Sequence, residues 1–156
     1  MTRSFLILFS TLILIGVNCS PPVEKLDPGI IIKSSSNTID STYNTLKKLI
    51  SSNPNLTIIA ELDHQDNAAS VDLTLSPTRI ILFGNPKLGT PLMQESQVTG
   101  IDLPQKILVF QEPTGEVKIA YNDPEYLKSR HGLTKQDKIL STMSTALDKL
   151  TESASK

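Results

Sequence analysis

Two stretches of the chain carry apolar residues at the spacing of an amphipathic helix. The first has such residues at Ile39, Tyr43, Leu46, Leu49 and Ile50, before Asn53-Pro54-Asn55 ends the pattern. The second, near the C-terminus, has them at Ile139, Leu140, Met143, Ala146, Leu147 and Leu150. Because this spacing places apolar side chains on one side of a helix, it predicts helices over residues 38–52 and 135–151.

Between these helices the pattern changes to short apolar runs of the kind that form strands. Residues 30–32 are β-branched, and residues 79–83 are apolar on both faces, which predicts a strand in the middle of a sheet. Residues 106–110 and 116–121 flank a short Pro-Gly turn, which predicts an antiparallel hairpin. A further strand is predicted over 56–62, and its inward positions are Leu56, Ile58, Ala60 and Leu62.

Capping residues indicate where the other helices begin and end. Asp123-Pro124 can start a short helix that Gly132 closes, and Thr134 with Asp137 approximates a capping pair for the last helix. A short helix is also expected around residues 67–69. Together these elements predict an α+β fold: a four- or five-stranded, mostly antiparallel sheet with helices packed on one face.

The N-terminal residues differ from the rest of the chain. Arg3 precedes apolar runs at residues 5–9 and 12–15, and the stretch ends at Cys19. A basic start and a short apolar run are typical of an export signal, whereas a spanning helix needs about 20 apolar residues. We expect a signal peptide over 1–18, a Pro-rich tether over 19–28 and one domain over 29–152. An uncleaved membrane anchor is the alternative.

Cys19 is the single cysteine of the chain, so it excludes an internal disulfide and a Cys-rich metal site. The sequence Gly16-Val17-Asn18-Cys19 resembles the lipobox of bacterial lipoproteins. That resemblance implies that Cys19 carries diacylglyceryl and acyl chains such as palmitate and becomes the mature N-terminus. Several acyl chains anchor a protein stably. We therefore expect an exported protein held on a bacterial membrane, at the outer membrane or the periplasmic face, through lipid on Cys19.

Charge and aromatic content narrow the classes of partner. The formal net charge is -1, the pI is about 6.1, and aromatic residues make up 4% of the chain with no Trp. Nucleic-acid binding depends on a basic surface and, for single strands, on aromatic platforms. We expect no nucleic-acid partner.

The loop after strand 79–83 carries a candidate ligand site. Asn85-Pro86 and Thr90-Pro91 each place a capping residue before a proline, with Lys87 and Gly89 between them. Free backbone N–H groups at helix N-termini beside Lys87 can hold an anion or small molecule. The alternative is that Asn85 and Thr90 merely cap two helical turns and Gly89 takes a positive φ.

Asp63 and His64 follow strand 56–62 and are expected to converge on this loop from the neighbouring strand end. The ligand-binding candidates are thus Asp63, His64, Asn85, Lys87, Gly89 and Thr90. As a carboxylate–imidazole pair, Asp63 and His64 can also act as a general base, although neighbouring strand residues point to opposite faces. The alternative is that Asp63 caps the next helix.

His64, Met93 and His131 are weak candidates for a copper or haem ligand set. A core role for Met93 and a helix-terminal role for His131 are the alternatives. No GxSxG or HExxH motif is present, so we expect no hydrolase or zinc-protease chemistry and leave the cofactor unassigned.

The segment from Phe83 to Met93, FGNPKLGTPLM, resembles a bacterial and archaeal family called domain of unknown function 302. Further stretches support the resemblance: ELDH at 61–64, GIDLP at 100–104, YNDP at 121–124 and RHGL at 130–133. It covers about residues 29–150 and implies a compact α+β fold, often dimeric, without an agreed activity. Our leading interpretation is a lipid-anchored, non-enzymatic binding or accessory module. The alternative is a small-ligand or metal/haem-binding periplasmic protein with enzymatic activity.

Overall fold

The computed structural model describes residues 24–26 and 29–156. The predicted signal peptide, Cys19 and most of the predicted tether lie outside the described residues. One part of that tether forms a three-residue strand, β1 (Glu24–Leu26), which pairs with the first strand of the domain. Within the described part of the chain, no helix is both long enough and apolar enough to cross a membrane.

The sheet is antiparallel throughout and has the strand order β1-β2-β6-β5-β4-β3. Its other strands are β2 (Ile30–Ser35), β3 (Thr57–Asp63), β4 (Thr78–Gly84), β5 (Gln105–Gln111) and β6 (Val117–Asn122). The predicted hairpin is β5–β6. The α+β class and the antiparallel sheet are confirmed, and β1 adds a short sixth strand at one edge.

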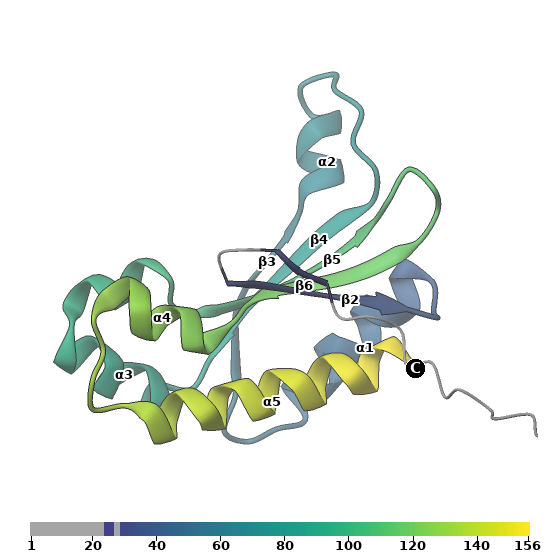
Figure 1. The fold of residues 1–156 in the computed structure, drawn as a ribbon. Helices are drawn as coiled ribbons and strands as arrows, with labels where there is room; N and C mark the ends of the chain where they lie inside the picture. The colour runs from purple at the N-terminus through teal and green to yellow at the C-terminus, as the bar shows by residue number, and fades with distance from the viewer. Residues whose placement is uncertain (1–23, 27–28) are drawn as a thin grey trace, which may run out of the picture.

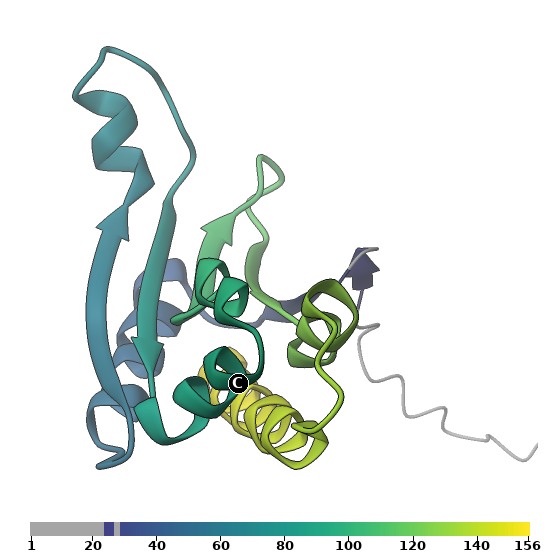
Figure 2. The ribbon, with the colours of Figure 1, turned by 90° about the vertical axis from the view of Figure 1, so that its left-hand side faces the viewer.

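The two long helices lie on one face of this sheet, as predicted (Figure 1). They are α1 (Ile39–Ser51) and α5 (Asp137–Ser155), and they also pack on each other. The shorter helices are α2 (His64–Ala69), α3 (Pro86–Glu95), a 3-10 helix η1 (Gln97–Ile101) and α4 (Pro124–His131). Figure 2 shows α2 at one end of the β3–β4 hairpin and α3 at the other.

Several helix ends follow the capping residues in the sequence. Asp123 accepts the Glu125 N–H and so caps α4, and Gly132 closes that helix at φ 66°. At this positive φ a residue with a Cβ would be strained. Asn85 likewise accepts the Lys87 N–H and caps α3.

Three local predictions are wrong. Thr134 does not cap α5; its N–H and hydroxyl donate to Glu95 at the end of α3, which lies close to the α4–α5 loop in space. Residues 86–95 form one helix with Pro91 inside it, so Thr90 caps no second turn. Gly89 lies within that helix, and its φ is not positive.

Strand β3 is an edge strand, and this explains a fourth difference. Its register shifts between Ile58 and Ala60, so the alternation predicted from Leu56 to Leu62 is broken. Leu62 is 45% exposed and Ile59 is 60% exposed. Strand β4 is an interior strand, as expected, but lies next to the edge, while β5 and β6 lie at the middle of the sheet.

The buried apolar residues form two clusters that meet along α5. One cluster joins the sheet to α1 and the C-terminal half of α5, and includes Leu46, Ile81 and Leu147. The other joins α3, α4 and the first half of α5, and includes Leu92 and Leu127. The second cluster lies beyond one end of the sheet, and this end holds the site described next.

Candidate functional site

The residues that the sequence grouped into one site lie at two ends of the sheet. Strands β3 and β4 are antiparallel, so Asp63 pairs with Arg79, whereas Gly84 pairs with Thr57. Thr57 and Asp63 are six positions apart along β3, or about 20 Å at the usual rise per residue. Asp63 and His64 are therefore far from Asn85, Lys87 and Thr90, and the predicted convergence is wrong. That prediction required β3 and β4 to end at the same edge of the sheet, as parallel strands do.

Asp63 serves as a helix cap and an ion-pair partner. Its carboxylate accepts the N–H groups of Gln65 and Asp66 at the start of α2, at 2.9 and 3.2 Å, and pairs with Arg79 Nε at 2.8 Å. Partial burial alone would raise the pKa of Asp63, but the hydrogen bonds from Asp66, Arg79 and Gln65 outweigh it and lower that pKa. This is the alternative in which Asp63 caps the next helix, and these contacts account for the position of its side chain.

The weak metal-ligand candidates do not form one site either. His64 begins α2 at the far end of the sheet, while Met93 lies in α3. His131 ends α4, and its Nε2 lies 2.5 Å from Asp102 Oδ2 with both side chains largely buried. Arg130 Nε approaches the same carboxylate oxygen at 3.3 Å. Among the described residues, no group of three or more His, Cys, Asp or Glu side chains is arranged to hold a metal ion.

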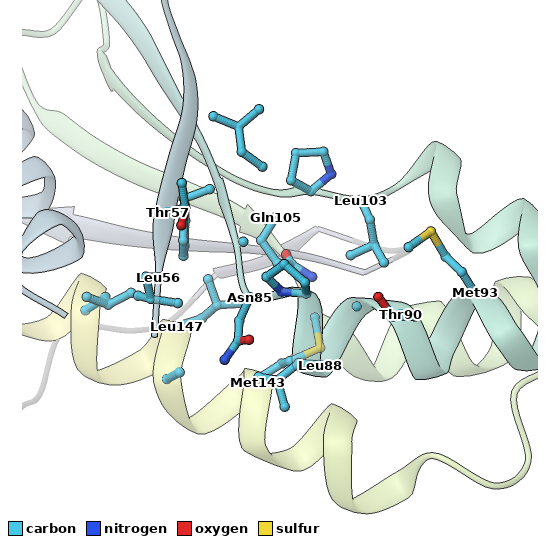
Figure 3. Close-up of a pocket in the computed structure, with 18 residues that line it drawn as sticks. Leu56, Thr57, Asn85, Leu88, Thr90, Met93, Leu103, Gln105, Met143 and Leu147 are labelled. Carbon is cyan, nitrogen blue, oxygen red and sulfur yellow. The ribbon is translucent and has the colours of Figure 1, made fainter. Parts of the chain in front are cut away.

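A cavity of about 450 Å³ lies between α3, α5 and the end of the sheet (Figure 3). Its walls come from the start of β3, the end of β4, the segment before β5 and both helices. Leu88 and Met143 belong to the second apolar cluster or pack on it, and Phe83 and Leu147 belong to the first. The cavity therefore occupies the place where the two clusters meet.

The cavity lining is almost entirely apolar. None of the described residues that form it has an ionisable side chain. Its polar side chains are those of Thr57, Asn85, Thr90 and Gln105. The two threonines are exposed, and Asn85 Oδ1 accepts the Lys87 N–H at 2.9 Å, so these groups belong to the rim or to the cap of α3.

Gln105 differs from the other polar residues of the lining. It is the first residue of β5, is 7% exposed, and pairs in register with Phe83 of β4. Its Nε2 atom is fully buried and has no hydrogen-bond partner among the described residues. A buried donor without an acceptor costs about 1–3 kcal/mol, so such groups are rare in folded proteins. An apolar cavity with one unpaired donor is suited to an apolar ligand that carries an acceptor.

Part of the predicted ligand loop does contribute to this cavity. Asn85, Gly89 and Thr90 line it, and a Cβ at Gly89 would be in ordinary van der Waals contact with Leu103 Cδ1, at 3.5 Å. Lys87 does not line it: the side chain is exposed on α3. The sequence predicted this loop to be an anion site. In the structure it forms part of the wall of an apolar cavity.

Neither Gln105 nor α5 was predicted from the sequence to form part of a site. Gln105 follows Pro104 and precedes an apolar run. A polar residue at such a position is expected to belong to the preceding loop and not to the core. The alternation of buried and partly exposed residues in β5 places Gln105 on the same face as Ile107 and Val109. That period-two pattern is the one signal in the sequence that predicts an inward-facing Gln105.

Comparison with known proteins agrees with this fold. The sequence matches the family described as "Domain of unknown function DUF302" over residues 31–150. The fold is similar to a crystal structure of an uncharacterized conserved DUF302 protein from Bacillus stearothermophilus, with a TM-score of 0.72 and 18% sequence identity. That similarity covers 81% of this chain and 98% of the other.

Curated relatives include proteins named as fluoride-specific ion channels. FluC 1 of Brucella suis biovar 1 is 33% identical over 114 residues, which make up 72% of this chain and 44% of the relative. FluC 2 of Brucella melitensis biotype 1 shows the same identity over 72% of this chain and 42% of its own length. This chain thus spans less than half the length of the curated relatives it matches. Since the family match covers most of the chain, the protein belongs to the DUF302 family.

Proposed function

We propose that this domain is a non-enzymatic binding module that holds a small, mostly apolar molecule in the cavity between α3 and α5. The observation that carries the proposal is the cavity itself: about 450 Å³, walled by two apolar clusters and without an ionisable lining residue. Ligand pockets in proteins have volumes of this size and are mostly apolar, with few polar groups. General acid–base or nucleophilic catalysis would need an ionisable or nucleophilic group in reach.

We further propose that the protein works at a membrane surface, anchored through lipid on Cys19. The proposal rests on the signal-like N-terminus and the lipobox resemblance around the single cysteine. The curated relatives are named as ion channels, which also work in membranes. Cys19→Ala should move the protein from the detergent phase to the aqueous phase. A variant that loses its leader and still partitions with detergent would contradict the anchor.

The binding proposal can be tested with an uncharged fluorescent probe. N-phenylnaphthylamine is added to the full-length chain carrying Cys19→Ala, so that no acyl chain of the protein can occupy the cavity. We expect saturable binding at one site per chain. Ala146→Phe places a ring from α5 in the cavity and should remove that binding, while the melting temperature stays equal or rises as in other cavity-filling variants.

The matched control is Ala69→Phe, which makes the same change at an exposed position of α2. It should bind the probe like the parent chain. Probe binding that is absent from the parent, or unaffected by Ala146→Phe, would contradict the proposal.

We propose a second copy of the chain as the partner of the other sheet face. Helices α1 and α5 cover the face that carries Ile81 and Ile107, so alternate residues point to the uncovered face (Figure 1). Its described apolar residues are Ile30, Ile32, Ala60, Leu62, Ile80, Leu82, Leu108, Phe110 and Ala120. Lys106 and Lys118 stand on the same face, next to Leu82 and Phe110. Apolar residues gathered on an open sheet face mark an interaction surface, and the family resemblance implies a dimer.

Sedimentation velocity tests the dimer. Leu108→Lys, in the centre of the uncovered face, should give a monomer. Val98→Lys, on the exposed part of η1, should leave the dimer intact. A parent chain that sediments as a monomer at micromolar concentration would contradict this partner.

A further inference from the structure

From the unpaired amide of Gln105 we infer the class of ligand: an uncharged, hydrocarbon-rich molecule with a carbonyl or similar acceptor oxygen in the cavity. This inference rests on the proposed binding function and deepens it. Gln105 lines the cavity at the start of β5, and its Nε2 is fully buried without a partner among the described residues. Because Nε2 is fully covered, the Gln105 side chain has to turn its amide toward the cavity when a ligand binds. A ligand oxygen then accepts the hydrogen bond that no described residue accepts.

The size of the cavity limits the ligand to a small lipid-like molecule. An apolar cavity of about 150 Å³ holds one benzene ring. By proportion, about 450 Å³ has room for roughly 18 carbon-sized atoms. A medium-length acyl chain or a substituted ring system fits this limit, whereas a whole phospholipid does not.

The absence of charge in the lining excludes an ionic group at the buried end of the ligand. No described lining residue is basic, and Lys106, which follows Gln105, donates from Nζ to the Asp102 carbonyl at 3.1 Å. A carboxylate beside Gln105 would lose its hydration without gaining a cation, which is a large unfavourable term. A ketone, ester or amide carbonyl accepts the Gln105 hydrogen bond without that term. The class is therefore neutral carbonyl compounds rather than free fatty-acid anions.

Three probes with the same number of non-hydrogen atoms test this inference by displacement of N-phenylnaphthylamine from the full-length Cys19→Ala chain. They are methyl nonyl ketone, dodecane and decanoate, the last held at a pH where it is ionised. The ketone should bind about three- to tenfold tighter than dodecane, the range for one neutral hydrogen bond. It should bind at least tenfold tighter than decanoate.

Substitution of Gln105 tests whether its side-chain amide donates the hydrogen bond to the ligand oxygen. Gln105→Met keeps an unbranched side chain of similar length and removes the donor, so the ketone and dodecane should then bind equally. Gln94→Met, on the exposed side of α3, is the matched control and should keep the preference for the ketone.

The possible results separate this inference from the binding proposal. Equal binding of ketone and dodecane to the parent chain, or tightest binding of decanoate, would overturn the ligand class and leave the cavity function standing. A parent chain that binds none of the probes would overturn the cavity function as well. The comparison of probes on the parent chain decides the matter even if Gln105→Met does not fold.

Discussion

The two ends of the β3–β4 hairpin differ in how their polar side chains are paired. At the α2 end, Arg79 pairs with both Asp63 and Asp40, and its guanidinium lies 5.6 Å from the centre of the Tyr43 ring. At the α3 end, Gln105 is more deeply buried than any of these charged groups, and no residue in the described part of the chain accepts from its Nε2. The charged groups around Arg79 are thus paired with one another, whereas the candidate binding site at the α3 end is marked by a buried amide nitrogen without a partner among the described residues.

Charged residues that lie close together are not by themselves evidence of a functional site. Carboxylates, an arginine and a histidine near one another attract functional interpretation, yet here the hydrogen bonds of Asp63 account for its position fully. A buried donor without a partner beside a cavity is a stronger indication, because a molecule in the cavity can supply the acceptor. The buried hydroxyls of Thr99 and Ser144 also lack a partner among the described residues, but neither residue lines the cavity.

The largest expected effect comes from the apolar wall at the α3 end. Leu92 is fully buried in the cluster that joins α3, α4 and α5. Leu92→Ala should lower the free energy of unfolding by about 2–5 kcal/mol, because it removes buried methyl groups and leaves a void. Urea denaturation measures this loss. A cost below about 1 kcal/mol would show that α3 is not packed on the domain as described.

A smaller effect is expected at the paired end. Arg79→Met keeps the stem of the side chain but removes its contacts with Asp40 and Asp63. Because both pairs are partly exposed, we expect a loss of about 1 kcal/mol in the free energy of unfolding and no change in probe binding. Reduced probe affinity in a folded Arg79→Met chain would break the distinction between the two ends.

Acid should weaken the fold through the same end. The pKa of Asp63 is lowered in the folded protein, and in the unfolded chain it returns to about 3.9. Its contribution is therefore fully present above about pH 5 and is lost as the pH falls through the depressed folded value. Asp63→Asn should reduce the slope of stability against pH below about pH 4 in urea titrations. An unchanged slope would show that this carboxylate is not paired in solution.

The smallest effects are expected for two residues that the sequence placed in one site. Lys87 is exposed on α3, and His64 lies at the far end of the sheet. Lys87→Ala and His64→Ala should each change the free energy of unfolding by less than about 0.5 kcal/mol and leave probe affinity unchanged. A thermal-shift titration with the probe checks both. A lower probe affinity in either variant would show that the substituted residue does contribute to the binding site.

Much of the fold could be predicted from local patterns. The apolar spacings around Leu46 and Leu147 mark the two long helices, and Asp123-Pro124 with Gly132 marks the ends of α4. These patterns depend only on residues that are close together in the sequence, so they predict the same elements for any tertiary arrangement. The edge position of β3 and its bulge could not be predicted, because they depend on which strand pairs with β4.

The site could be predicted only in part, for a related reason. Asn85, Gly89 and Thr90 were singled out by their capping and turn chemistry, and they do line the cavity. The error lay in joining them to Asp63 and His64, since strand direction decides which strand ends meet. Gln105 carries no motif, and its role depends on burial and on the absence of a partner, which a sequence does not display.

The central claim is that a small apolar molecule binds inside the cavity and not on the uncovered sheet face. The most direct test is to measure nuclear Overhauser effects between bound N-phenylnaphthylamine and protein methyl groups in the full-length Cys19→Ala chain. We predict contacts to Ala146, Leu147 and Leu88, which line the cavity. Contacts to Leu82 and Leu108 of the uncovered face instead, with none to the cavity methyl groups, would contradict it.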